Sequence, residues 1–135
     1  MTHATERLIR DYYAAFDAGD REGMLALLAE DVIHDVNQGP REVGKAAFRD
    51  FLGHMDRCYR EGIRDLAVMV DATGRRAAAE FVVEGEYRAT DAGLPPARGQ
   101  RYRLPAGAFF EVAEGRIRRV TTYYNLQDWI RQVRG

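Results

Sequence analysis

The sequence predicts a single α+β domain in which N-terminal helices pack on a curved antiparallel sheet and leave a cone-shaped pocket between the two layers. In the first half of the chain, apolar residues repeat mainly at helical spacing. The second half is rich in Val, Ile, Phe, Tyr and Thr, which favour strands, and short turn sequences separate its segments. The 135 residues have the length of one domain and contain no linker or repeat, so we treat residues 1–135 as one unit.

Three segments of the first half fit helices. From Glu6 to Ala18 the apolar positions recur at intervals of three and four, and Gly19 follows where a left-handed cap ends a helix. Asp20 then suits the N-cap of a short helix over residues 21–29. A third helix begins after Gly44. Its apolar stripe consists of Phe48, Phe51, Leu52, Met55 and Tyr59.

Strand patterns follow. Residues 32–36 alternate as a short strand, and the turn sequence 37–40 ends it. Four further strands are predicted at residues 63–70, 77–90, 100–112 and 117–125. Short connections make antiparallel pairing the expected arrangement, and Gly85 and Gly107 are suitable places for the longer strands to bend. Residues 126–131 fit a closing helical turn or two.

Composition excludes several classes of function. Lys and Arg number 20 against 21 Asp and Glu, a formal charge of -1, so nucleic acid is not an expected partner. No run of about 18 apolar residues is present, so we expect no membrane partner. The single cysteine, Cys58, excludes an internal disulfide and favours a reducing, cytoplasmic location. His54 lies one helical turn before Cys58, but no third ligand is evident, so we expect no metal and no other cofactor.

Beyond these patterns, the sequence shows a family resemblance. The order of elements resembles the nuclear transport factor two-like superfamily, and within it the SnoaL-like and ketosteroid-isomerase-related branch. The matching features are the segment 12–20 (Tyr-Tyr-Ala-Ala-Phe-Asp-Ala-Gly-Asp), the segment 24–28, Glu30-Asp31, and Gly44 before an amphipathic helix. The resemblance covers essentially the whole chain. It implies the cystatin-like, cone-shaped fold of that superfamily and a cofactor-independent isomerase, cyclase or dehydratase. Such an enzyme takes a proton from beside the carbonyl of a small hydrophobic compound, steroid-like or polyketide-like.

The resemblance also suggests catalytic residues. In the steroid isomerases of the superfamily, a helix Tyr and a strand Asp form an oxyanion hole while a second Asp moves the proton. The Tyr matches Tyr12, and the proton-moving Asp matches Asp35, or Val36 if an alignment gap is placed later. The other acid falls on Gly107, which leaves the oxyanion hole incomplete. We expect Tyr124 to supply the missing donor.

Alternation along residues 32–36 leaves two alternatives for the proton-transfer group. If the Ile33 face looks into the pocket, Asp35 has partly apolar surroundings and a raised pKa. His34 points the opposite way, so one of the two is structural, and we favour Asp35 for the pocket. Tyr12 has the alternative role of a plain core aromatic.

The expected substrate-binding set completes the site. It comprises Asn37, Phe48, Phe81, Val83, Gly107, Phe109, Thr122, Leu126 and Trp129. Asn37 has the alternative role of a turn residue.

A non-catalytic alternative remains open. The same cavity can hold a hydrophobic ligand, or only shape a dimer, without chemistry. Gly107 favours this hypothesis, whereas Tyr12 with Asp35 favours the enzyme. Apolar and aromatic residues on the outer face of the predicted sheet indicate a homodimer.

Overall fold

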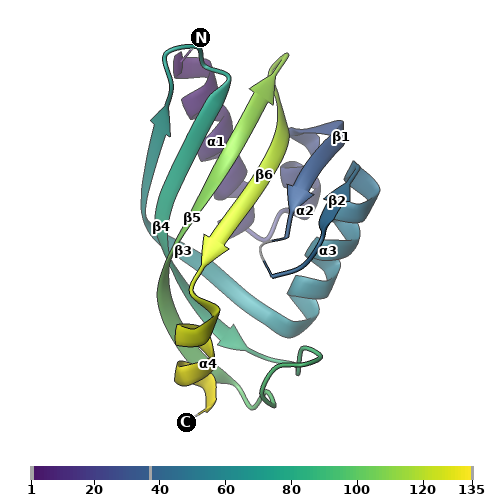
Figure 1. Ribbon diagram of the computed structural model, residues 1–135, viewed down its shortest axis with the longest axis vertical. Helices are drawn as coiled ribbons and strands as arrows, with labels where there is room; N and C mark the ends of the chain where they lie inside the picture. The colour runs from purple at the N-terminus through teal and green to yellow at the C-terminus, as the bar shows by residue number, and fades with distance from the viewer. Residues whose placement is uncertain (1, 37, 135) are drawn as a thin grey trace.

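The computed structural model describes residues 2–36 and 38–134. Its elements are α1 (Thr2–Asp17), α2 (Arg21–Ala26), β1 (Leu28–Asp35), β2 (Arg41–Val43), α3 (Lys45–Cys58), β3 (Tyr59–Val70), β4 (Arg76–Tyr87), β5 (Gln100–Ala113), β6 (Arg116–Tyr124) and α4 (Leu126–Arg134). The two ends of the chain lie at opposite ends of the molecule (Figure 1). Within these described residues, the helices are too short or too polar to cross a membrane.

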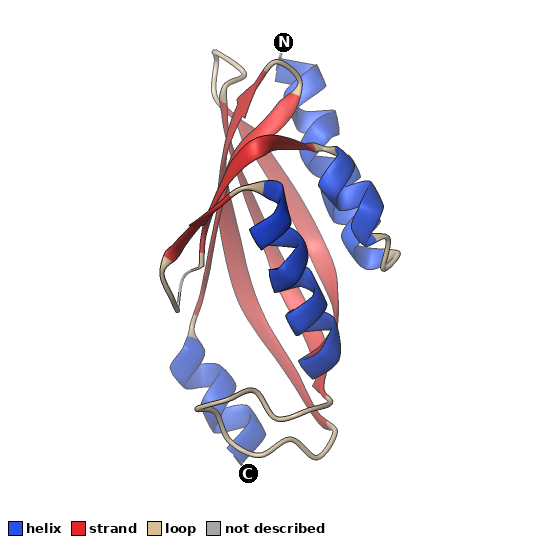
Figure 2. Ribbon diagram, turned by 90° about the vertical axis from the view of Figure 1, so that its right-hand side faces the viewer, coloured by secondary structure: helices blue, strands red, loops and turns tan. Residues whose placement is uncertain are grey.

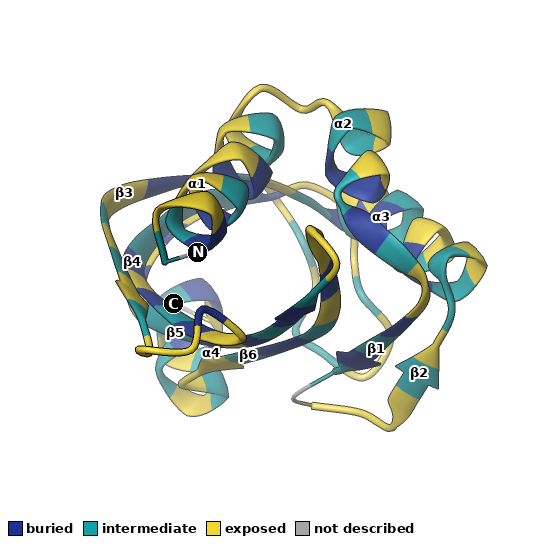
Figure 3. Ribbon diagram, turned by 90° about the horizontal axis from the view of Figure 1, so that it is seen from above, coloured by how far each residue is buried: buried dark blue, intermediate teal, exposed yellow. Residues whose placement is uncertain are grey.

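The strands form one sheet in the order β2-β1-β6-β5-β4-β3. The four strands β3 to β6 pair antiparallel in succession, as predicted. β1 instead pairs with β6 in parallel, so the described sheet is mixed. The sheet curves as an arc, and α1, α2 and α3 close its hollow side (Figure 3). The predicted α+β fold is therefore confirmed.

Several helix ends form as their sequence signals indicate. Gly19 has a φ of 70°, the left-handed conformation predicted after the first helix. The Asp20 carboxylate accepts a hydrogen bond from the Gly23 backbone N–H at 2.9 Å and so caps α2. Gly44 stands at the N-cap of α3 with a φ of 103°.

Other boundaries differ from the prediction. The second helix ends at Ala26 rather than near residue 29, because β1 already begins at Leu28. At this point the Ile117 N–H donates to the Leu27 carbonyl, so pairing with β6 replaces helical hydrogen bonds. Tyr59 begins β3 instead of ending α3, and β2 was not predicted. The register of β4 with β5 runs unbroken past Gly85 and Gly107, so the bends predicted there involve no bulge.

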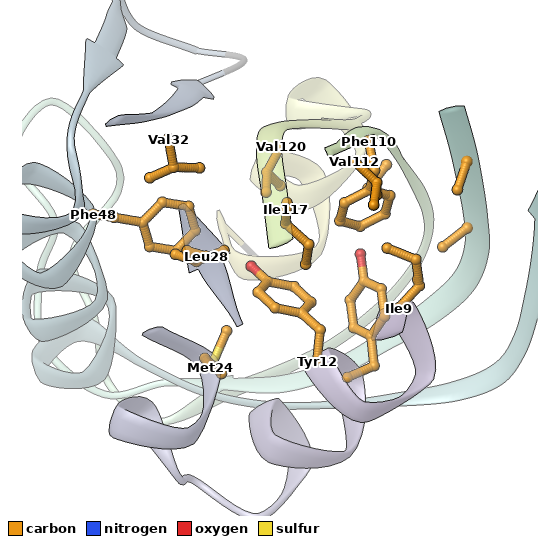
Figure 4. Packing of buried hydrophobic residues seen from close by; sticks show 14 of the residues in the cluster. Ile9, Tyr12, Met24, Leu28, Val32, Phe48, Phe110, Val112, Ile117 and Val120 are labelled. Atoms are coloured by element: carbon orange, nitrogen blue, oxygen red, sulfur yellow. The ribbon is translucent and has the colours of Figure 1, made fainter. Parts of the chain in front are cut away.

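Two hydrophobic clusters fill the hollow side. The upper cluster joins the helices to the sheet, and Figure 4 shows its labelled members converging from both layers: Ile9, Tyr12, Met24, Leu28, Val32, Phe48, Phe110, Val112, Ile117 and Val120. The lower cluster lies around α4 and contains Tyr87, Tyr102, Leu104, Trp129 and Val133. Each large apolar side chain buried in this way stabilises the fold by about 1.5–3 kcal/mol.

Candidate functional site

Asp35 lies on the outer face of the sheet, away from the helices. Its neighbour in β6 is Thr121, whose own partner in β5, Phe109, is 49% exposed. The carboxylate accepts hydrogen bonds from Arg41 Nε at 2.6 Å and from the Thr121 hydroxyl at 2.7 Å. The Arg41 bond, followed by the Thr121 bond, lowers the pKa of Asp35. The prediction of a raised pKa in the pocket is wrong, because the parallel register with β6 turns the Ile33 and Asp35 face outward.

His34 takes the inner position instead. Its ring is buried between Phe48 and Phe51, with ring centroids 4.6 and 4.5 Å away. The Nδ1 atom is 3.9 Å from Glu42 Oε1, and neither atom has a hydrogen-bond partner. Burial lowers the pKa of His34 to about 4, so the ring is neutral near pH 7. Of the two alternatives for this strand, the structure therefore matches the one in which His34 points inward.

Tyr12 occupies the upper cluster as a core aromatic. Its ring makes edge contacts with Tyr13 and Phe110, at centroid distances of 5.2 and 5.9 Å. Burial raises the pKa of the Tyr12 hydroxyl, which remains protonated. The surroundings of Tyr12 thus match the structural alternative given above.

The predicted lining residues divide between the two faces. Gly107 pairs with Glu80 and Tyr123 on the outer face, where Phe109 also lies, so these two do not line the interior. On the hollow side, Phe81, Val83 and Thr122 lie on the inner face of the sheet, and Phe48, Leu126 and Trp129 lie on α3 and α4; each is buried or half-buried. Asn37 lies outside the described residues.

The structure places a half-buried acid that was not predicted, Glu61 on β3. Glu61, Gly85 and Tyr102 are direct neighbours across three strands. The Tyr102 hydroxyl donates to Glu61 Oε2 at 2.5 Å, passing over Gly85. A Cβ atom on Gly85 would come within 2.4 Å of the Tyr102 ring, so only glycine leaves room for this contact.

The surroundings of Glu61 favour its neutral form. Burial raises the pKa of Glu61, while the Tyr102 hydrogen bond and the charge of Arg21 act in the opposite direction. Burial and the nearby Glu61 charge also raise the pKa of Tyr102. A carboxyl group with a raised pKa beside a phenol is a candidate for proton transfer.

A second cluster of polar side chains lies around the end of α3. We call it the Asp91 cluster: His54, Cys58, Tyr59 and Asp91. His54 Nε2 lies 3.0 Å from Asp91 Oδ1, and the Tyr59 hydroxyl donates to Asp91 Oδ2 at 2.7 Å. The thiol sulfur of Cys58 lies within 4.8 Å of the ligand atoms of His54 and Asp91.

Aromatic side chains connect Glu61 to the Asp91 cluster. Trp129 makes edge contacts with Tyr59 and Tyr102, at centroid distances of 6.0 and 5.8 Å. Burial, then the charges of Glu61 and Asp91, raise the pKa of Tyr124. The Tyr124 phenol therefore remains protonated at neutral pH and can donate a hydrogen bond.

A surface hollow of about 970 Å³ reaches Glu61 and Tyr102. Most of its other lining residues are charged or small: Asp17, Arg60, Gly62, Arg64, Glu84, Gly85, Glu86, Arg101, Arg103 and Gln132. This hollow differs from the apolar cavity expected from the sequence. The charged lining residues on β3, β4 and β5 alternate with Glu61, Gly85 and Tyr102, so the hollow opens on the outer face of the sheet and reaches Glu61 from there.

The strand boundary explains why Glu61 was missed. Tyr59, Glu61 and Ile63 share one face of β3, and a charged residue between an aromatic and an apolar one would have indicated a special position. The predicted strand began only at Ile63, so Glu61 fell outside it. Asp91 lies in a loop, where the sequence pattern carries no information about spatial neighbours.

Comparison with known proteins identifies the family. Residues 9–120 match the SnoaL-like domain. The chain belongs to the SnoaL-like family. This SnoaL-like chain is 62% identical to a candidate polyketide cyclase of Pseudomonas putida KT2440, with a TM-score of 0.94 over 98% of each chain. It is 56% identical to a candidate polyketide cyclase of Xanthomonas campestris pv. campestris, with a TM-score of 0.94 over 97% of each chain.

A more distant structure agrees with the fold. An NTF2-like protein of Burkholderia xenovorans LB400 is 17% identical, with a TM-score of 0.77 over 98% of each chain. The match to the SnoaL-like domain confirms the predicted family, and this structure confirms the predicted nuclear transport factor two-like fold. No curated protein sequence matches this SnoaL-like chain significantly.

Proposed function

We propose that this SnoaL-like chain is a cofactor-independent enzyme of the cyclase or isomerase type, in which Glu61 moves a proton on a small carbonyl compound. The observation that carries the proposal is the raised pKa of Glu61 at a position that Tyr102 and a surface hollow both reach. The similarity of the chain to two candidate polyketide cyclases supports a hydrophobic ring compound as substrate. Glu61 replaces Asp35 as the proposed base.

The proposed reaction begins with the Glu61 carboxylate removing a proton from the carbon beside the carbonyl. The electron pair of that C–H bond passes to the carbonyl oxygen, which gives an enolate. In an isomerisation, the proton returns from Glu61 to another carbon. In a cyclisation, the enolate carbon bonds to a second carbonyl carbon of the same substrate, whose oxygen takes the proton. Tyr102 orients Glu61 throughout.

Solvent deuterium exchange tests the proton step directly. The wild-type protein in D2O is expected to exchange the protons beside the carbonyl of a ring ketone from an enolisable panel, which proton NMR detects. Glu61→Gln should slow exchange about 100-fold or more, the usual contribution of a general base. Because the pKa of Glu61 is raised, the exchange rate should still increase with pH above the range where an ordinary Glu has ionised.

The matched control is Asp35→Asn. This variant removes a carboxylate on the outer face and should retain the wild-type exchange rate. Loss of exchange in Asp35→Asn, with retention in Glu61→Gln, would return the chemistry to Asp35. If the wild type binds ring ketones but exchanges none of them, the chain is a ligand-binding module instead.

A further inference from the structure

We propose that His54, Cys58 and Asp91 form a zinc-binding site at the end of α3. The three ligand atoms all lie within 4.8 Å of one another, close enough to converge on one ion after small side-chain movements. His54 and Cys58 are one helical turn apart, and the structure supplies through Asp91 the third ligand that was not evident in the sequence. The site goes beyond the proton transfer proposed for Glu61.

The fold holds the third ligand against the helix. The loop between β4 and β5 begins beside the end of α3, where the backbone N–H groups of Arg88 and Ala89 donate to the Cys58 carbonyl at 2.7 and 3.2 Å. The Asp91 N–H then donates to the Tyr87 hydroxyl at 2.9 Å. Figure 2 shows this loop passing between the end of α3 and α4. Asp91 is therefore fixed at both its backbone and its side chain.

The donor set matches the chemistry of zinc. Imidazole nitrogen, thiolate sulfur and carboxylate oxygen are its three common protein ligands, and three of them leave a fourth position for water or another small ligand. The thiolate and the carboxylate together carry the charge that a divalent cation neutralises. The Tyr59 hydroxyl donates to Asp91 Oδ2 and leaves Oδ1 free to turn from His54 to the ion, as an outer-shell partner does.

Metal titration of the purified, untagged full-length protein tests the site. After treatment with a chelator and its removal, the wild type is expected to bind one equivalent of zinc in isothermal titration calorimetry. Cys58 is the single cysteine, so Co²⁺ bound in place of zinc should give a thiolate-to-cobalt absorption band that reports Cys58 alone. Cys58→Ser should abolish this band, and Cys58→Ser and His54→Ala should each weaken zinc binding about 100-fold or more, because even outer-shell losses cost about 10–100-fold.

His3→Ala is the matched control, since it removes an exposed histidine at the start of α1, outside the Asp91 cluster, and should leave zinc binding unchanged. Circular dichroism of each variant verifies that its fold is retained. A wild type that binds zinc no more tightly than folded Cys58→Ser overturns the proposal, as does Co²⁺ binding without a thiolate band. Neither readout uses turnover, so the result is independent of the Glu61 proposal.

Discussion

At the scale of single residues, two carboxyl groups show how position decides chemistry. Asp35 and Glu61 both lie on strands, but Asp35 faces outward and is paired with Arg41, which lowers its pKa. Glu61 faces inward, where burial outweighs the Tyr102 hydrogen bond and raises its pKa. An ion-paired carboxylate is a weaker base than a carboxyl group whose pKa is raised.

His34 makes folding sensitive to acid. Its pKa is about 4 in the fold, against an ordinary value of 6.5, because the buried ring resists charging. As the pH falls through 6.5, the unfolded chain gains a proton that the folded protein does not take until about pH 4. The free energy of unfolding of the wild type should therefore decrease by about 3 kcal/mol across this window.

His34→Leu removes this pH dependence and replaces the ring with an apolar side chain. The free energy of unfolding of His34→Leu minus that of the wild type should be about 3 kcal/mol larger at pH 4 than at pH 6.5. Urea denaturation at several pH values measures this difference. The control, His3→Leu, changes an exposed histidine and should show no comparable increase. A constant difference between His34→Leu and the wild type over this range would contradict the assignment.

At the scale of elements, the unbroken register of β3, β4 and β5 brings Glu61 and Tyr102 together across Gly85. Gly85→Ala would place a methyl group within 2.4 Å of the Tyr102 ring and force the phenol away from Glu61. We expect deuterium exchange to slow by about tenfold or more while the fold is retained, because misplacing a catalytic contact costs rate rather than secondary structure. Exchange kinetics and circular dichroism measure the two effects.

Gly53→Ala is the matched control for that variant. Gly53 lies on α3, and a Cβ atom there would make one ordinary contact, at 3.6 Å with Arg57. The exchange rate of Gly53→Ala should remain close to the wild-type rate. Equal slowing in Gly53→Ala and Gly85→Ala would mean that an added methyl group slows exchange whether or not it meets Tyr102, and that Tyr102 has no particular role.

Local sequence signals made most of the helices and strands predictable. Pairing between distant segments accounts for most of the differences between the predicted and the observed structure. Gly19, Asp20 and Gly44 act on their immediate neighbours, so their roles at helix ends follow from the sequence. The parallel pairing of β1 with β6 joins residues more than 80 positions apart. That pairing decides whether His34 or Asp35 points inward, and the pattern of residues 32–36 fits both answers.

At the scale of the whole molecule, the outer face of the sheet carries exposed apolar side chains. Phe109 and Tyr123 are 49% and 51% exposed and meet edge to face at 5.8 Å, and Val43 and Met69 extend this face along the sheet. Isolated apolar residues are common on protein surfaces, but an aromatic pair on an open sheet face is typical of an interface. We propose that this face pairs with the same face of a second copy.

The double variant Phe109→Lys with Tyr123→Lys tests the dimer. Placing lysines on both copies of a twofold interface brings like charges together and removes the aromatic contacts, each of which contributes about 2 kcal/mol or more when central. We expect the wild type to sediment as a dimer at micromolar concentration and the double variant as a monomer. The dimer dissociation constant of the double variant should be at least about 100-fold higher. Asp50→Lys, an exposed site on α3, should remain dimeric. A monomeric wild type, or a double variant that stays dimeric, would show that the outer face has another role.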